Sequence, residues 1–187
     1  MIRHILGAGI AGIAGRINAA RDLFGTLSAT GLPTGVIVQR AVGTYSTNTN
    51  IATVLPSDDT VPNDTEGGSV ISKAFTPTSA TNRVVCRFTG FGSCDNAGGG
   101  DIAAALFSST ATSALDAVAA TISSANEMAC LALQYEYLPG VATAITYTVR
   151  FGPGSGGAGN ARLNGTAAAR RFGGVAAAKL IIEEVQA

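Results

Sequence analysis

The chain has 187 residues, of which 47% are hydrophobic but only 6% aromatic, and its 12 lysines and arginines balance 12 aspartates and glutamates. This length suits one sizeable domain, or a medium domain with an arm, and the neutral balance argues against nucleic acid as a ligand because no basic field gathers phosphates. Charged residues make up 13% of the chain, about half the usual share, so we expect part of the surface to be covered by copies of the chain or by neighbouring proteins.

The N-terminal segment contains a glycine pattern that resembles a nucleotide site. Gly7, Gly9 and Gly12 match the G-x-G-x-x-G fingerprint of dinucleotide-binding folds. In such folds the fingerprint follows a buried strand, and an acidic residue closes the next strand. The next predicted strand here carries Gln39 and Arg40 instead. We therefore predict no nucleotide and no other cofactor.

Residues 1–34 are predicted to form a partly helical docking arm that ends in a linker. Its apolar surface would come from Ile5, Ile10, Ile13, Ile17 and Phe24. The apolar run before Arg16 is about ten residues long, too short to span a bilayer as a helix, and glycines interrupt it without a following A-x-A cleavage site. We expect the arm to bind other proteins rather than a membrane, and the folded domain to occupy residues 35–187.

From residue 35 onward the sequence shows the two-residue alternation of antiparallel strands. The strongest candidates are 83–91, 127–137, 143–151 and 178–185, and weaker ones are 36–42, 51–55, 69–76 and 101–107. About eight short strands separated by turn signals predict an all-β fold, an antiparallel β-sandwich of the jelly-roll type. Thr and Ser crowd residues 108–129, which are expected to form a long connection with at most one helical turn.

The densest acidic cluster lies in the segment LPSDDTVPNDTEGG, residues 55–68. Asp58, Asp59, Asp64 and Glu66 offer oxygen ligands for calcium, but their spacing departs from the D-x-[DN]-x-[DN]-G loop. Asp and Asn in such connections usually bond to their own backbone. We predict a structural turn, with a calcium site as the alternative.

The sequence offers no catalytic constellation. His4 is the only histidine, it lies in the arm, and no G-x-S-x-G elbow is present. Outside the acidic cluster, a pair of catalytic carboxylates would have to come from Glu127 and Glu136. We therefore predict that the protein is not an enzyme.

The three cysteines are too few for a disulfide framework. Cys86 and Cys130 fall within predicted strands, where a free thiol usually packs as a small apolar side chain. A bridge between Cys86 and Cys94 across a hairpin would require an oxidising compartment. Its formation stays open at this point.

Two features are candidates for contact with other molecules. Tyr135 and Tyr137 flank Glu136 in a predicted strand and are candidates for contact with a host surface, although tyrosines that face a core would show the same pattern. The segment ARRF, residues 169–172, forms a small basic spot. We expect it to be an exposed turn or a contact between subunits.

Several segments together resemble a β-domain of virion appendage proteins of tailed bacteriophages. They are the strand GVIVQRAVGTYST, the connection D-D-T-x-P-x-x-T-E-G at 58–67, the motif T-P-x-S-x-x-N at 76–82, and the closing strand FGGVAAAKLIIEEV at 172–185. The resemblance extends from about residue 35 to residue 185 and does not include the arm. It implies a jelly roll that assembles as a trimer in a virion.

The resemblance implies a non-enzymatic structural protein, a homotrimer that docks to other virion proteins through its arm after assembly in the host cytoplasm. A tail fibre or host-contact module, with a host surface glycan or receptor as partner, is the first expectation. A head fibre or capsid decoration protein is the alternative within the same class. A different class, a secreted or cell-surface carbohydrate-binding β-sandwich module, would also fit the predicted fold.

Overall fold

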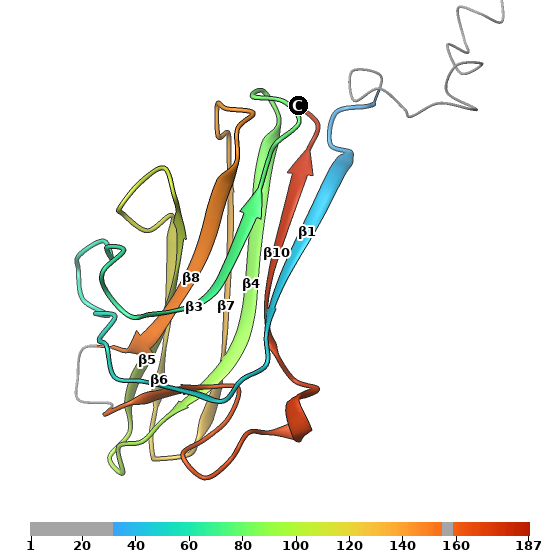
Figure 1. The fold of residues 1–187 in the computed structure, drawn as a ribbon. Helices are drawn as coiled ribbons and strands as arrows, with labels where there is room; N and C mark the ends of the chain where they lie inside the picture. The colour runs from blue at the N-terminus through green and yellow to red at the C-terminus, as the bar shows by residue number, and fades with distance from the viewer. Residues whose placement is uncertain (1–31, 155–158) are drawn as a thin grey trace, which may run out of the picture.

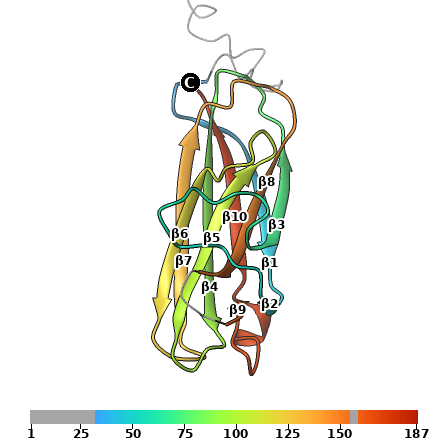
Figure 2. The same ribbon diagram turned by 90° about the vertical axis from the view of Figure 1, so that its left-hand side faces the viewer.

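The computed structural model describes residues 32–154 and 159–187. The predicted docking residues Ile5, Ile10, Ile13, Ile17 and Phe24 therefore lie outside the described residues. The described chain forms two antiparallel sheets that pack face to face, as Figures 1 and 2 show from two sides. This arrangement confirms the predicted all-β fold class.

The larger sheet has six strands, in the order β1-β10-β4-β9-β2, with β7 paired to the other edge of β4. Its strands are β1 (Ile37–Tyr45), β2 (Thr49–Ile51), β4 (Arg83–Cys94), β7 (Met128–Tyr137), β9 (Ala161–Leu163) and β10 (Ala178–Val185). The smaller sheet has the order β3-β8-β5-β6. Its strands are β3 (Gly68–Phe75), β5 (Gly100–Ser108), β6 (Asp116–Ile122) and β8 (Ile145–Pro153).

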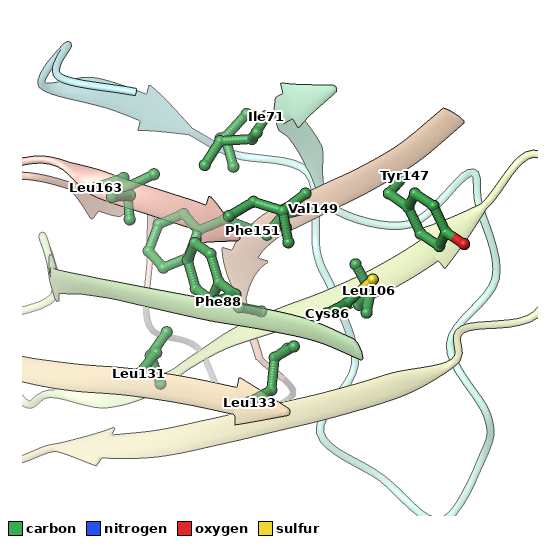
Figure 3. Close-up of a cluster of buried hydrophobic side chains, with 14 of the residues drawn as sticks. Ile71, Cys86, Phe88, Leu106, Leu131, Leu133, Tyr147, Val149, Phe151 and Leu163 are labelled. Atoms are coloured by element: carbon green, nitrogen blue, oxygen red, sulfur yellow. The ribbon is translucent and has the colours of Figure 1, made fainter. Parts of the chain in front are cut away.

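The core lies between the two sheets and follows from the alternation in the sequence. Strand β8 buries every second residue against the larger sheet, namely Ile145, Tyr147, Val149 and Phe151. Phe88 of β4 faces Phe151, and Leu131 and Leu133 of β7 approach from the same sheet as Phe88 (Figure 3). These large side chains account for the strands that were predicted most clearly.

The prediction that residues 108–129 form one long connection is wrong, because β6 spans Asp116–Ile122 within it. The seven residues alternate between half-buried and exposed positions, and the strand pairs with β5 along its whole length. Ala117 and Ala119 occupy the outward positions. Because these outward residues are apolar like the inward Val118 and Ala120, the alternation of polar and apolar residues that marks a half-buried strand is absent. The three-residue strand β9 was also not predicted.

Residues 51–55 were predicted as a strand, but β2 ends at Ile51. The following residues instead begin a connection, residues 52–67, that crosses the outer face of the smaller sheet (Figure 2). Leu55 packs there against Ala103, Ala105 and Phe107, which are the outward residues of β5. Its amide also donates a hydrogen bond of 2.8 Å to the carbonyl of Pro153.

All three cysteines are free. Cys86 and Cys94 lie on the same strand, β4, so eight extended residues separate them by about 26 Å and no bridge can form between them. Burial raises the pKa of the Cys86 thiol to about 12, so this thiol stays protonated. Cys130 is exposed on β7, and the expectation that it packs as a buried apolar side chain is wrong.

Candidate functional site

The acidic connection contains two similar turns. The amide and hydroxyl of Thr60 both donate to Oδ1 of Asp58, and the amide and hydroxyl of Thr65 both donate to Oδ1 of Asn63. Glu66 accepts a 2.9 Å bond from the amide of Asn63. The hydrogen bonds from Thr60 hold the pKa of the Asp58 carboxyl below its ordinary value. These local bonds agree with the predicted structural turn.

The four acidic residues of the connection have separate surroundings. Asp58 and Glu66 accept the bonds just described, and Asp59 and Asp64 are exposed. Within residues 32–154 and 159–187, no group of three or more His, Cys, Asp or Glu side chains converges as around a metal ion. Calcium therefore remains an alternative to be tested in solution.

We expect chelation to leave the melting temperature of the protein unchanged. The physical reason is that hydrogen bonds from neighbouring residues already satisfy Asp58 and Glu66. Thermal unfolding is measured with excess EDTA and with millimolar calcium. A clear rise in melting temperature that depends on calcium, and that Asp58→Asn abolishes, would replace the turn assignment with a metal site.

A groove lies between the connection and the outer face of β5 and β6. It consists of two adjoining hollows of about 260 and 390 Å³ that share Asp58, Thr60, Pro62 and Ala117. Ala103 and Ala119 extend the apolar floor, which also includes Pro62 and Ala117. Asp58, Asp59 and Asp116 form the rim. We call this feature the acidic groove, and it suits a ligand with both apolar and positively charged groups.

The other predicted carboxylates do not come together. Glu136 forms a 2.6 Å ion pair with Arg83 on the outer face of the larger sheet. Glu127 accepts a 2.9 Å bond from the amide of Ser123, in the turn that precedes β7. Nine extended residues place the two carboxylates about 30 Å apart along β7, far beyond the separation used in glycoside hydrolysis.

Tyr135 and Tyr137, the candidates for host contact, are half-buried and pack against the core. The hydroxyls of Tyr137 and Tyr147 lie 2.8 Å apart, and the two rings meet edge to face. Burial is the main cause that raises the pKa of both tyrosines. Tyr137 therefore joins the two sheets through Tyr147, and contact of Tyr135 and Tyr137 with a host surface stays a prediction.

A buried carboxylate that the sequence did not reveal lies on β10. Glu184 is fully buried and accepts hydrogen bonds from the turn after β3. The donors are the amide and hydroxyl of Thr78 (2.9 and 2.8 Å), the amide of Ser79 (3.2 Å), Nδ2 of Asn82 (2.7 Å) and Nε2 of Gln39 (2.6 Å). We call this arrangement the Glu184 latch. The only sequence signal was an acidic residue in an apolar closing strand, and it does not tell Glu184 from Glu183.

The Glu184 latch joins two of the segments that carry the resemblance. The T-P-x-S-x-x-N motif supplies Thr78, Ser79 and Asn82, and the closing strand supplies the carboxylate. Burial by itself raises the pKa of Glu184, but the hydrogen bonds outweigh it and hold the pKa below its ordinary value. The motif thus has a structural role in closing the sandwich.

A basic loop protrudes between β9 and β10. It contains Arg170 and Arg171, followed by Phe172, which is 77% exposed, and Val175, which is 89% exposed. Phe172 has a φ of 52°, a conformation that is rare for a bulky side chain. The sequence predicted an exposed turn or subunit contact here, and the structure shows the exposed turn. Subunit contact is not tested.

No helix in the described part of the chain has both the length and the apolar character required to cross a membrane.

No protein-family model and no curated protein matches this chain. Among solved structures it is similar to the EclA C-terminal domain, a sugar-binding protein, at 14% identity over 79% of this chain and 92% of that chain, with a TM-score of 0.34. It is also similar to the CBM36-1 domain of a multidomain xylanase from the hindgut metagenome of Trinervitermes trinervoides, at 9% identity over 77% and 96% of the two chains, with a TM-score of 0.35. A third similar structure is the enzymatically active domain of tailspike protein 4 of bacteriophage CBA120, at 13% identity over 69% of this chain and 19% of that chain, with a TM-score of 0.27. These neighbours are largely carbohydrate-binding β-sandwich modules, and the low scores assign no ligand to this chain.

Proposed function

We propose that the chain is a non-catalytic structural protein of a tailed-phage virion, which acts as a homotrimer and docks through residues 1–34. The observation that carries the proposal is the basic loop, where Phe172 and Val175 are 77% and 89% exposed. We take two large apolar side chains exposed in one short loop as part of an association surface. The small share of charged residues, 13%, supports the same conclusion.

The Glu184 latch also supports a structural role. In this latch the motif at 76–82 supplies hydrogen-bond donors, and the acidic residue of the closing strand accepts them. The segments that resemble the phage family therefore build the sandwich and its closing turn. Within this class we put a tail fibre or host-contact module first and a head fibre or capsid decoration protein second.

The purified full-length chain is expected to be a homotrimer at micromolar concentration. A trimer would cover the exposed apolar side chains of the basic loop, which a monomer leaves in water. Multi-angle light scattering measures the mass, which should be three times that of the chain. A stable monomer at this concentration would contradict the proposed function.

The acidic groove favours a second candidate function, the binding of a glycan. Carboxylates on its rim could accept hydrogen bonds from sugar hydroxyls, and the description of one similar structure names a sugar-binding protein. A glycan array separates the candidates. Binding that Asp59→Ala removes, and that Asp64→Ala outside the groove leaves intact, would support this function.

A further inference from the structure

The basic loop is presented from a firmly bonded base. Asn164, which is fully buried, donates from Nδ2 to the carbonyls of Tyr45 (2.7 Å) and Thr47 (3.1 Å), and its Oδ1 accepts from the amide of Ala178 (3.0 Å). The hydroxyl of Ser93 donates to the carbonyl of Gly165, the residue that follows Asn164, at 2.9 Å. These bonds join β1, β4, β9 and β10 beneath the loop, so the exposed tip has a defined position.

The tip combines positive charge, apolar surface and backbone strain. In the described residues, neither Arg170 nor Arg171 forms an ion pair. Phe172 extends into solvent from a φ of 52°, and a bulky residue held in that region stores strain of the kind that gathers at functional positions. Backbone bonds hold the turn itself, because the amide of Gly174 donates to the carbonyl of Arg171 (3.2 Å) and the amide of Val175 donates to the carbonyl of Phe172 (3.0 Å).

The acidic groove has the complementary properties. Its rim carries Asp58, Asp59 and Asp116, and no cation of the described chain pairs with them. Its floor of alanine and proline is apolar, and the smaller hollow measures about 260 Å³. A cavity of roughly 150 Å³ holds a benzene ring, so there is room for a phenylalanine side chain.

The basic loop and the acidic groove lie on opposite sides of the sandwich. Figure 1 shows the connection that borders the groove, in teal, on the left, and the η2 turn (Phe172–Gly174), in red, at the lower right. The loop therefore cannot reach the groove of its own chain. Head-to-tail contacts between two different surfaces close into a ring when the rotation between successive copies closes, and otherwise extend as an open filament.

We infer that the basic loop of one copy docks in the acidic groove of the next copy, with Phe172 over the alanine floor and Arg170 and Arg171 against the aspartates of the rim. A ring of three chains requires each contact to turn the next copy by about 120°, whereas a smaller turn would give a larger ring or an open filament. This inference rests on the proposed homotrimer and identifies the two surfaces that build it. Because opposite charges meet at the rim, the assembly weakens as salt concentration rises.

Charge reversal in the full-length chain tests the contact. The loop variant is Arg170→Glu with Arg171→Glu, the groove variant is Asp59→Lys with Asp116→Lys, and a third chain carries all four changes. Each of the first two should dissociate the trimer at concentrations where the unmodified chain is assembled, and the chain with all four should reassemble. Phe172→Gly should weaken assembly by at least about 30-fold, the loss expected for an aromatic anchor. It should not lower the melting temperature of the monomer, because glycine accepts the positive φ.

Matched controls are Leu138→Ser, which removes another exposed apolar side chain, and Asp64→Lys, which reverses an acid outside the groove. Both should remain trimeric. If the unmodified chain is a trimer and all variants stay trimeric, the docking is wrong while the proposed function stands. If the unmodified chain is a monomer, the proposed homotrimer itself fails. If only deletion of residues 1–31 dissociates the trimer, the arm and not the loop holds the copies together, which also overturns the inference.

Discussion

Replacement of Glu184 by alanine is expected to lower the free energy of unfolding by about 3–5 kcal/mol, because it leaves several buried donors without a partner. The donors come from Gln39 on β1 and from Thr78, Ser79 and Asn82 in the turn after β3. Their release would detach that turn from the closing strand. Urea unfolding at a fixed protein concentration measures the change.

The matched control is the neighbouring residue, Glu183, which faces outward on the same strand and pairs with Arg40 and Arg87. Both arginines are about half exposed, so water can solvate them when the carboxylate is removed. Glu183 is itself only 8% exposed, so Glu183→Ala should cost about 1–2 kcal/mol, less than Glu184→Ala. If both variants lose the same free energy of unfolding, the Glu184 latch stabilises the fold no more than the ion pairs of Glu183 do.

The same latch predicts how stability depends on pH. Since the folded pKa of Glu184 lies below its unfolded value, its contribution is complete above the unfolded pKa, about 4.3. It is lost as the pH falls from there through the folded pKa. Glu184→Gln removes this titration, so the difference in stability between the two proteins should shrink below about pH 4. A constant difference between pH 6 and pH 3 would contradict the assignment.

The second large effect is expected at Gly152, where the chain passes beneath the acidic connection. A Cβ at this position would lie 2.3 Å from the carbonyl oxygen of Thr53, which is backbone and cannot rotate away. Gly152→Ala should therefore displace the connection, weaken the bond between Leu55 and Pro153, and expose Leu55. We expect a loss of about 2–4 kcal/mol. Hydrogen exchange at the Leu55 amide reports the displacement directly.

Gly98→Ala serves as the control, because the nearest atom to its Cβ is Oδ1 of Asn96, at 3.8 Å. This substitution should change stability by less than about 0.5 kcal/mol. If Gly152→Ala behaves in the same way, and the Leu55 amide remains protected, the connection does not pack on the sheet as described.

Large side chains made most of the fold predictable. In β8 and β10 the apolar residues alternate with polar or outward residues, and the predicted bounds of β10, 178–185, agree with the structure. Local hydrogen bonding was equally accessible to prediction, because Asp58 and Asn63 bond to residues only two positions further along the chain. In both cases the signal that predicts the structure lies in residues that are near neighbours in the sequence.

The remaining features depend on residues that are far apart in the chain. Strand β6 forms because β5 offers a complete ladder of partners, although Ala117 and Ala119 leave almost no hydropathy contrast to detect. Glu184 and Glu183 are chemically identical and both buried, and only the donors of Thr78 and Asn82, more than 100 residues away, make Glu184 the anchor of the latch. The sequence by itself thus determined most of the strands, the sandwich and the turns of the acidic connection, but not β6 or β9. Tertiary structure alone decided where the buried carboxylate, the acidic groove and the exposed Phe172 lie, because burial and pairing at those positions come from segments that meet only when the two sheets close.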